Sequence, residues 1–236
     1  MKKTIKIFLK KLYFRVKYSK NKPLFIKAKP SFSQCGEDLI VDYIFGLRHI
    51  QHPTYLDIGA HDPNYLNNTA IFYQRGCRGV NIEANPALIQ NFIDARPEDT
   101  NINIGISDLE GELDFYIMKD DTLSTFSKKE YQFMVENGKD LFRIKKINLT
   151  TIQAILEKYC QGIFPDFLTV DVEGMDFQII QSIDFSRSSP KVICIEAADY
   201  SPIGAGERRN EIIEFLVGNG YFEYANTNLN AIMVKR

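Results

Sequence analysis

The sequence lacks several features that mark common classes of protein. Its 236 residues include no tryptophan, three histidines and four cysteines, with no C-x-x-C pair. We therefore expect no structural zinc site, and the dispersed cysteines are typical of reduced thiols in a bacterial-type cytoplasm. The sequence contains no run of about 18 apolar residues, so no membrane-spanning helix is expected. The basic N-terminus is not followed by the small-residue cleavage site of a secretory signal.

Acidic residues are missing from the start of the chain. Residues 1–36 hold 11 basic residues and no acid, which leaves a net charge of −12 for residues 37–236. Apolar residues at helical spacing between Ile5 and Val16 predict an amphipathic helix. Two alternatives stay open: it packs on the rest of the protein, or residues 1–20 lie on an anionic membrane surface. We expect a basic extension at residues 1–30 and one domain at 31–236, in the cytoplasm or at the inner face of the membrane.

Short apolar strands alternate with helical stretches from residue 37 onward. The pattern predicts strands at 54–60, 79–84, 101–106, 112–118, 166–174 and 191–197, helices at 37–47, 67–75, 85–95, 149–159, 175–183 and 207–220, and a closing hairpin at 221–236. An insert is expected between residues 118 and 148. The alternation predicts an α/β fold with a mostly parallel sheet, helices on both faces and an antiparallel C-terminal hairpin.

The turn after the first predicted strand lacks the glycines of a dinucleotide-binding loop. In "YLDIGAHDPNYLNNTA" (55–70), Gly59 is the single glycine, and it follows Asp57. An acid here repels a pyrophosphate but suits the amine and sulfonium of S-adenosylmethionine, and Gly59 lets the backbone approach that ligand. Glu83, at the end of the second strand, suits the hydroxyls of an adenosine ribose. The pattern favours a methyl donor over NAD.

Acids also follow the later strands. Because the carboxyl ends of parallel strands meet at one edge of a sheet, we expect Asp57, Glu83, Asp108, Asp171 and Glu196 to lie along the same edge. Acids at strand ends also cap the helices that follow them. The number of acids favours a ligand site at this edge.

Several stretches together resemble the FkbM family of S-adenosylmethionine-dependent methyltransferases. They are "SFSQCGEDLIVDYIF", "YLDIGAHDPNYLNNTAIFYQRGCRGVNIEANP", "NIGISDLEGELDFY", "LSTF" and "FLTVDVEGMDFQII", and the similarity covers about residues 31–200. The resemblance implies a class I methyltransferase fold, Rossmann-like with a seven-stranded sheet. It also implies O-methylation, commonly of sugars in surface glycans or of natural products.

The resemblance and the turn chemistry together predict which residues bind the methyl donor. They are Gln34, Asp38, Asp57, Gly59, Ala60, Asn68, Thr69, Glu83, Ala84, Ser107, Asp108 and Asp171. Thr69 is expected to help the amides at a helix N-terminus bind the donor carboxylate. The stretch that includes Gln34 and Asp38 forms a wall of the donor pocket or caps the following helix, and both alternatives stay open.

A sugar hydroxyl is a poor nucleophile, so a base or a metal ion must accept its proton. His61 has the intrinsic pKa of a base near neutral pH. Alternatively, Asp171, Glu173 and Glu196 hold Mg²⁺ or Mn²⁺, which activates a chelated hydroxyl or diol. We therefore expect His61, Asp171 and Glu173 to be the catalytic residues, with the choice between base and metal left open.

The expected acceptor is a sugar or nucleotide-sugar, used for capsule or lipopolysaccharide, and no nucleic acid is expected to bind. The insert at 118–148 and the loop at 197–210 are expected to shape the acceptor pocket, with Arg208 and Arg209 interpreted as surface charge or as a diphosphate site. The oligomeric state stays open, a homodimer being one alternative. The competing functions are a nicotinamide-dependent sugar oxidoreductase, disfavoured by the missing glycines, and a non-catalytic nucleotide-binding protein.

Overall fold

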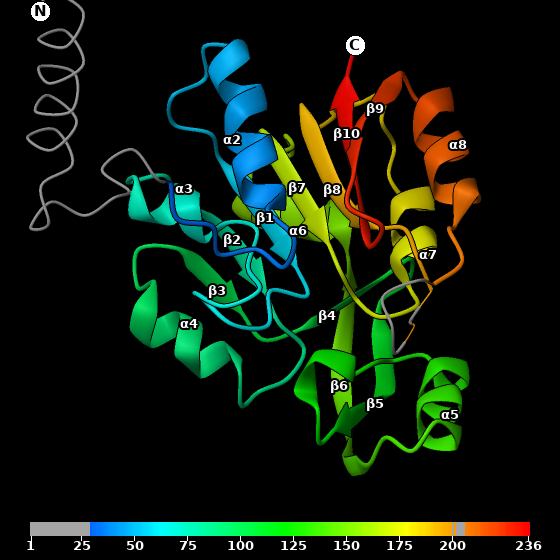
Figure 1. The fold of residues 1–236 in the computed structure, drawn as a ribbon. Helices are drawn as coiled ribbons and strands as arrows, with labels where there is room; N and C mark the ends of the chain where they lie inside the picture. The colour runs from blue at the N-terminus through cyan, green and yellow to red at the C-terminus, as the bar shows by residue number, and fades with distance from the viewer. Residues whose placement is uncertain (1–28, 200, 202–205) are drawn as a thin grey trace, which may run out of the picture. The chain divides into compact units, whose positions relative to one another are not determined.

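Seven strands form one mostly parallel sheet in the computed structural model, which describes residues 29–199, 201 and 206–236 (Figure 1). The strand order is β3-β2-β1-β7-β8-β10-β9. The strands are β1 (Tyr55–Ile58), β2 (Gly79–Ile82), β3 (Thr100–Ile102), β7 (Phe167–Val170), β8 (Val192–Glu196), β9 (Tyr221–Asn226) and β10 (Asn230–Lys235). Strand β10 runs antiparallel to β8 and β9, while the pairs from β3 to β8 are parallel. The predicted sheet and C-terminal hairpin are confirmed.

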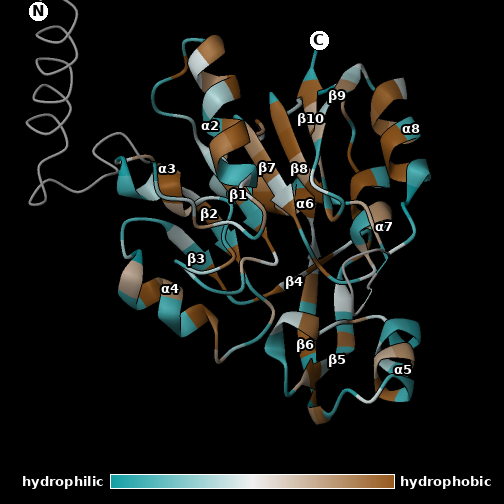
Figure 2. Ribbon diagram, viewed as in Figure 1, coloured by the Kyte–Doolittle hydropathy of each residue, from teal (hydrophilic) through white to brown (hydrophobic). Residues whose placement is uncertain are grey.

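Helices cover both faces of this sheet. The buried apolar side chains form two main clusters, one on each face of the sheet. One cluster includes residues of α2 (Glu37–Leu47) and α3 (Ala70–Gln74), and the other includes residues of α6 (Ile152–Tyr159), α7 (Asp176–Gln181) and α8 (Asn210–Gly218). Strand β8 shows the cause, because Val192 and Cys194 pack with the first group while Ile193 and Ile195 pack with the second. Strand β8 is buried on both faces, its residues 192–195 are all apolar, and it is mostly brown in Figure 2.

A second, three-stranded sheet lies at the carboxyl ends of the parallel strands. It has the order β4-β6-β5 and consists of β4 (Gly105–Ser107), β5 (Gly111–Met118) and β6 (Leu141–Thr151). Between β5 and β6 the chain forms the short 3-10 helix η1 (Asp121–Leu123) and helix α5 (Lys128–Glu136). The insert expected at 118–148 therefore includes most of a long strand. This small sheet provides one wall of the cavity described below.

Several predicted elements differ from the structure. The strand expected at 101–106 is split into β3 and β4, because the chain leaves the large sheet at Asn103, whose Nδ2 donates to the carbonyls of Glu83 and Ala84. The helix expected from residue 149 begins at Ile152. Residues 149–151 extend β6, and the Thr151 side chain accepts a hydrogen bond from the Ala154 amide, which caps α6.

Helix α4 (Ile89–Ala95) is also shorter than the predicted helix at 85–95, since residues 85–88 form a turn in which the Asn85 carbonyl accepts the Leu88 amide. The helix expected at 67–75 starts at Ala70. Residues Ser31–Arg236 form one compact unit. The predictions for residues 1–20 lie outside the described residues. Within the part of the chain that the structure describes, no helix is both long and apolar enough to cross a bilayer.

Candidate active site

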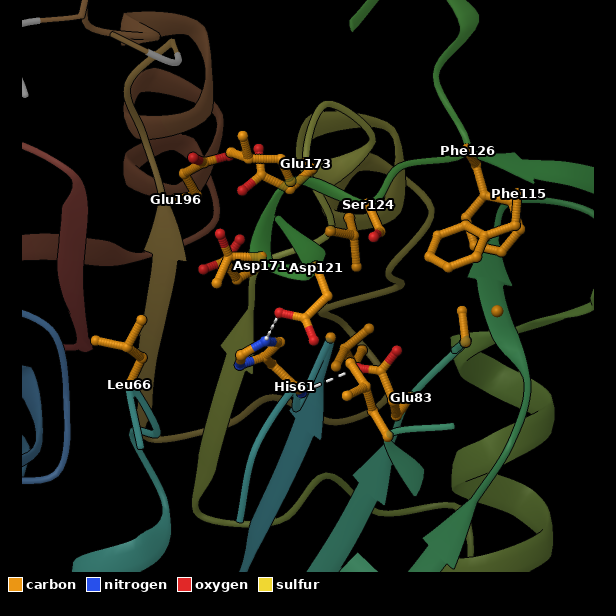
Figure 3. Close-up of a pocket in the computed structure, with 18 of the residues that line it drawn as sticks. His61, Leu66, Glu83, Phe115, Asp121, Ser124, Phe126, Asp171, Glu173 and Glu196 are labelled. Atoms are coloured by element: carbon orange, nitrogen blue, oxygen red, sulfur yellow. Dashed lines mark hydrogen bonds and ion pairs between the residues drawn. The ribbon is translucent and has the colours of Figure 1, made fainter. Parts of the chain in front are cut away.

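A cavity of about 370 Å³ lies at the carboxyl ends of β1, β2, β7 and β8, facing the small sheet and η1. Eight of the predicted site residues line it: Gln34, Gly59, His61, Glu83, Ala84, Asp171, Glu173 and Glu196. Figure 3 shows Phe115 and Phe126 toward one end, Glu173 and Glu196 toward the other, and His61, Asp121 and Asp171 between them. The strand order reverses between β1 and β7, which is where open α/β sheets bind ligands.

The Glu83 carboxylate is held in place by backbone amides. Its Oε2 accepts the His61 N–H at 2.9 Å, and its Oε1 accepts the Asn85 N–H at 2.6 Å. Burial raises the pKa of Glu83, and these two hydrogen bonds act in the opposite direction. Each oxygen has a second lone pair, so the oriented carboxylate can still accept two hydroxyl groups.

Apolar side chains continue the cavity beyond Glu83. The wall consists of Ile58, Ile82, Ala84, Leu88, Ile104, Ile106, Phe115 and Phe126. The rings of Phe115 and Phe126 contact each other with centroids 4.5 Å apart. Gly105 is required beside them, because a Cβ there would lie 2.5 Å from the ring of Phe126. A flat apolar surface next to an oriented carboxylate suits a base attached to a ribose.

Gly59 lines the cavity, and it also lies so close to the backbone of Asp171 that no side chain fits between them. It has φ +79°, and a Cβ at this position would lie 1.7 Å from the Asp171 carbonyl oxygen. The ends of β1 and β7 therefore approach more closely than any side chain permits. Close packing of two strand ends is thus a second reason for a glycine here, and the close approach to a ligand stays a prediction.

His61 is paired with a residue that the sequence did not predict. Its Nε2 lies 3.0 Å from Oδ1 of Asp121 in η1, and its Nδ1 is buried without a hydrogen-bond partner among the described residues. The His61 backbone has φ +56°, a conformation fixed by the hydrogen bond from its amide to Glu83. With Asp121 accepting from Nε2–H, the lone pair of Nδ1 is free to take a proton.

Three carboxylates meet at the other end of the cavity. Asp171 follows β7, Glu173 lies two residues later, and Glu196 ends β8; one oxygen of each lies within 4.8 Å of the others. Oε2 of Glu196 is buried and accepts no hydrogen bond. Glu173 has φ +54°, and its carbonyl accepts the Thr125 hydroxyl at 2.6 Å. The small sheet thus fixes the loop that carries this cluster.

The pKa values of the three acids are raised. Burial, followed by the neighbouring charges of Asp176 and Asp57, raises the pKa of Asp171 to about 7. Burial and mutual repulsion raise the pKa values of Glu173 and Glu196 well above their usual range. The Asp171 side chain meets solvent through the cavity while protein surrounds its other sides. A positive charge placed among these oxygens would relieve the repulsion.

Asp176 and Arg209 lie directly behind the cluster. The Asp176 carboxylate accepts the amides of Val172 and Gly174, which closes the loop between β7 and α7. Nη1 of Arg209 lies 3.6 Å from Asp176 Oδ2 and 3.8 Å from Glu196 Oε2, and its Nε donates to Asp199 at 2.7 Å. Arg209 is therefore a supporting partner of the acids, neither surface charge nor a diphosphate contact.

Seven of the predicted donor-binding residues do not line the cavity: Asp38, Asp57, Ala60, Asn68, Thr69, Ser107 and Asp108. Asp57 lies on the same face of β1 as Tyr55, whereas Leu56 and Ile58 face the opposite side. Its Oδ2 accepts the Thr69 hydroxyl at 2.8 Å and the Asn67 amide at 3.2 Å. The alternation within the strand was the signal that would have shown this direction.

Arg96 completes this buried group. It is 1% exposed, and its guanidinium donates to Thr69 Oγ1, to Asn67 Oδ1 and to the Pro63 carbonyl. Burial raises the pKa of Asp57 to about 6, while the Thr69 hydrogen bond and the charge of Arg96 oppose the rise. Asp57, Thr69 and Arg96 therefore hold the segment at 63–69 that follows the His61 turn.

The other residues outside the cavity have similar internal partners. Asp38 accepts hydrogen bonds from the hydroxyls of Ser31 and Ser33 and from the Phe32 amide. Asp108 accepts from Ser107 and from Gln178 of α7.

Asn68 donates to the Thr169 hydroxyl of β7, and Ala60 packs with Ile89 and Phe92. Of the N-terminal motif, Gln34 reaches the cavity and Asp38 anchors the chain before α2.

One family model matches this chain. The model of the methyltransferase FkbM domain matches residues 57–223, more than half of the chain. No curated protein matches it in sequence. An FkbM methyltransferase from Methylobacillus flagellatus is 12% identical with a TM-score of 0.44, over 78% of this chain and 43% of that chain, so the chain spans less than half of that relative.

Two further solved structures are similarly distant. A Staphylococcus aureus protein, provisionally assigned as a caffeoyl-CoA O-methyltransferase, is 12% identical with a TM-score of 0.49, over 97% of this chain and 100% of that chain. A Burkholderia thailandensis 1,6-didemethyltoxoflavin-N1-methyltransferase, solved with S-adenosylhomocysteine bound, is 10% identical with a TM-score of 0.41, over 85% of this chain and 77% of that one. The sheet order is that of the class I S-adenosylmethionine-dependent methyltransferases. The chain belongs to the FkbM methyltransferase family.

Proposed function

We propose that the protein is an S-adenosylmethionine-dependent O-methyltransferase that acts on a sugar hydroxyl of a surface glycan or its precursor. One observation carries the proposal. A single cavity contains an oriented carboxylate beside an apolar wall at one end, and a paired histidine with three clustered carboxylates at the other. The first end suits the adenosine of a methyl donor, and the second suits the activation of a hydroxyl.

The donor fits the end formed by Glu83, Phe115 and Phe126. The two amide hydrogen bonds to Glu83 aim its remaining lone pairs, which would accept the ribose hydroxyls. The apolar residues beside Ala84 would cover the adenine and exclude water from it. Bound in this way, the donor supplies an electrophilic methyl group, and the acidic residues beyond Glu83 favour its positive charge.

His61 and Asp121 are proposed to accept the proton of the attacking hydroxyl. Asp121 orients the imidazole and stabilises its protonated form, as a carboxylate does for a histidine base. The Glu83 hydrogen bond to the His61 amide fixes the same residue from the donor side. One turn of the chain thereby links donor position to base position, and holding reactants in line supplies much of the acceleration.

A divalent cation fits the carboxylate cluster. Three carboxylate oxygens lie within 4.8 Å of one another, and one oxygen of Glu196 is buried and accepts no hydrogen bond from the described residues. Mg²⁺ and Mn²⁺ prefer such oxygen ligands, and a bound cation would relieve the repulsion between the acids. Asp171, Glu173 and Glu196 would hold it, with Arg209 and Asp176 supporting them from behind. When bound, such an ion lowers the pKa of a coordinated hydroxyl.

Calorimetric titration with S-adenosylhomocysteine tests the donor site. We expect binding by the native chain and loss of at least about tenfold in affinity in Glu83→Ala. The control is Glu136→Ala, which removes a carboxylate of α5 that does not line the cavity. A native chain that binds neither S-adenosylhomocysteine nor S-adenosylmethionine would remove the proposal, and binding of NAD with oxidation of a sugar would favour the oxidoreductase alternative.

Transfer of a labelled methyl group to a panel of sugars and nucleotide sugars tests the reaction. We expect a product whose methyl ether is stable to mild alkali, which identifies an O-methylated sugar and excludes a methyl ester. Excess chelator should abolish turnover, Mg²⁺ or Mn²⁺ should restore it, and Glu196→Gln should weaken the restoration. Full turnover in excess chelator would remove the metal and leave the His61–Asp121 pair as the base.

A further inference from the structure

The mouth of the cavity carries three partly exposed acids. They are Asp120 and Asp121 beside η1 and Asp199 after β8, with side chains 48%, 47% and 57% exposed. The Thr122 hydroxyl and Lys139 lower the pKa of Asp120, so it is ionised at neutral pH. Acids enter the mouth from two separate parts of the chain, so a molecule that enters passes between negative charges.

Positive charge at the mouth is already paired. Lys139 is the one lysine or arginine among the described residues that line the cavity, and its Nζ lies 3.2 Å from Asp120 Oδ2. His61 is bound to Asp121, and Arg209 is bound to Asp199. Asp120 and Asp199 thus each hold one cation, and neither Lys139 nor Arg209 has the arrangement of a phosphate clamp, in which several donors converge on one anion.

The interior of the cavity is acidic as well. Four further acids line it: Glu83, Asp171, Glu173 and Glu196. The mouth acids act on whatever approaches next. Low-dielectric walls strengthen such fields, so the sign of the charge on an acceptor strongly affects its entry and binding.

We propose that the cavity selects acceptors by charge: it accepts neutral sugars and amino sugars and rejects uronic acids and nucleoside diphosphate sugars. The inference rests on the proposed function and deepens it, because it specifies the class of acceptor. Asp120 and Asp199 are the specificity-determining residues. By pairing with Lys139 and Arg209 they leave neither cation free for an anionic acceptor, and they do so without contact with the reacting atoms.

A basic and aromatic surface beside the cavity is where an anionic acceptor would bind if the inference were wrong. A hollow of about 510 Å³ adjoins the cavity at Leu88 and Asp121 and is lined by Lys119, Arg143 and Phe142. The guanidinium of Arg143 lies 5.4 Å from the centre of the Phe142 ring, and Lys119 is bound to Asp140 at 2.9 Å. A nucleoside diphosphate that avoided the acidic mouth would use this basic and aromatic surface.

The test compares acceptors that are built on the same hexose and differ in charge. Each hexose of the panel is supplied as its neutral methyl glycoside, as the matching uronic acid, as the 2-amino derivative and as the nucleoside diphosphate conjugate. For any hexose that is methylated, kcat/KM of the neutral form should exceed that of its uronic acid and of its conjugate by at least about tenfold at low salt. The ratio should shrink as salt is raised, since screening weakens exposed charges.

Variants of the mouth acids test whether these residues cause the preference for neutral acceptors. The double change Asp120→Asn with Asp199→Asn should reduce the preference for neutral over uronic acid acceptors by about three- to tenfold. Glu136→Gln, which removes a charge from the exposed part of α5, should leave the preference unchanged. Equal or better use of the uronic acid or the conjugate at low salt overturns the inference. Dependence of that use on Arg143, shown with Arg143→Gln, would assign the anion to the adjoining hollow.

If the protein methylates no member of the panel, a binding experiment tests the inference. Uridine diphosphate is titrated into the complex with S-adenosylhomocysteine at concentrations up to about 1 mM. Binding overturns the inference, and its absence supports it. Neither result bears on methyl transfer itself, whereas failure to bind S-adenosylhomocysteine would remove the proposed function instead.

Discussion

Replacing Gly59 with alanine tests the close packing of the strand ends that carry the site. At φ +79°, an alanine occupies the left-handed region at a cost of about 1 kcal/mol. Its Cβ would also lie 1.7 Å from the Asp171 carbonyl oxygen, whereas real Cβ atoms keep at least 3.0 Å. The ends of β1 and β7 must therefore separate.

That separation affects two interstrand hydrogen bonds. The Asp171 amide donates to the Ile58 carbonyl at 3.0 Å, and the Gly59 amide donates to the Ile82 carbonyl at 3.0 Å. Weakening both adds about 2 kcal/mol, for a total loss of about 3 kcal/mol in the free energy of unfolding. In a domain of this size the loss lowers Tm by roughly 6–12 °C.

Gly138→Ala is the matched control. Gly138 has φ +80°, and a Cβ there meets nothing within 4 Å, so this variant carries the left-handed cost alone. Urea unfolding and thermal melting of the two variants separate the steric contribution from the conformational one. Gly59→Ala should also weaken binding of S-adenosylhomocysteine, because Asp171 moves. Equal destabilisation by the two variants would refute the packing argument.

Three further predictions follow from buried groups. Asp57 has a pKa of about 6 against an ordinary 3.8, so its contribution to stability is fully present below about pH 4 and is lost as pH rises through 6. Asp57→Asn should flatten this part of the pH dependence of urea unfolding, by about 3 kcal/mol between the two limits. Arg96→Met removes three hydrogen bonds to buried acceptors and should lower the free energy of unfolding by about 3 kcal/mol, whereas Arg78→Met, at a partly exposed side chain, should lower it by less. Asp121→Asn should lower kcat by about tenfold with little change in affinity for S-adenosylhomocysteine, and an unchanged kcat would contradict the pairing with His61.

The residues that end each parallel strand were predictable, and the directions of their side chains were less so. Glu83, Asp171 and Glu196 follow apolar stretches, and parallel strands bring their carboxyl ends to one edge. Asp57 was assigned to the donor because an acid and a glycine followed the first strand. Its place in the strand turns it to the opposite face, toward Thr69.

Contacts between distant segments could not be predicted. Asp121 reaches His61 from an insert whose strands were not recognised, and Phe115 and Phe126 meet because β5 and the loop after η1 fold together. The chain leaves the large sheet at Asn103 and enters the small one at Gly105, a change that no local pattern announces. These contacts depend on the packing of the complete chain.

The sequence by itself determined the class of fold, the edge of the sheet that carries the site, the family resemblance and the acids that gather there, because the alternation of strands with helices and the residues that end each strand are local properties of the chain. Tertiary structure alone decided which groups partner each acid, which acid supports a buried arginine, and which charges surround the mouth. Those outcomes depend on side chains brought together from distant segments, and their partners exist only once the sheet has formed.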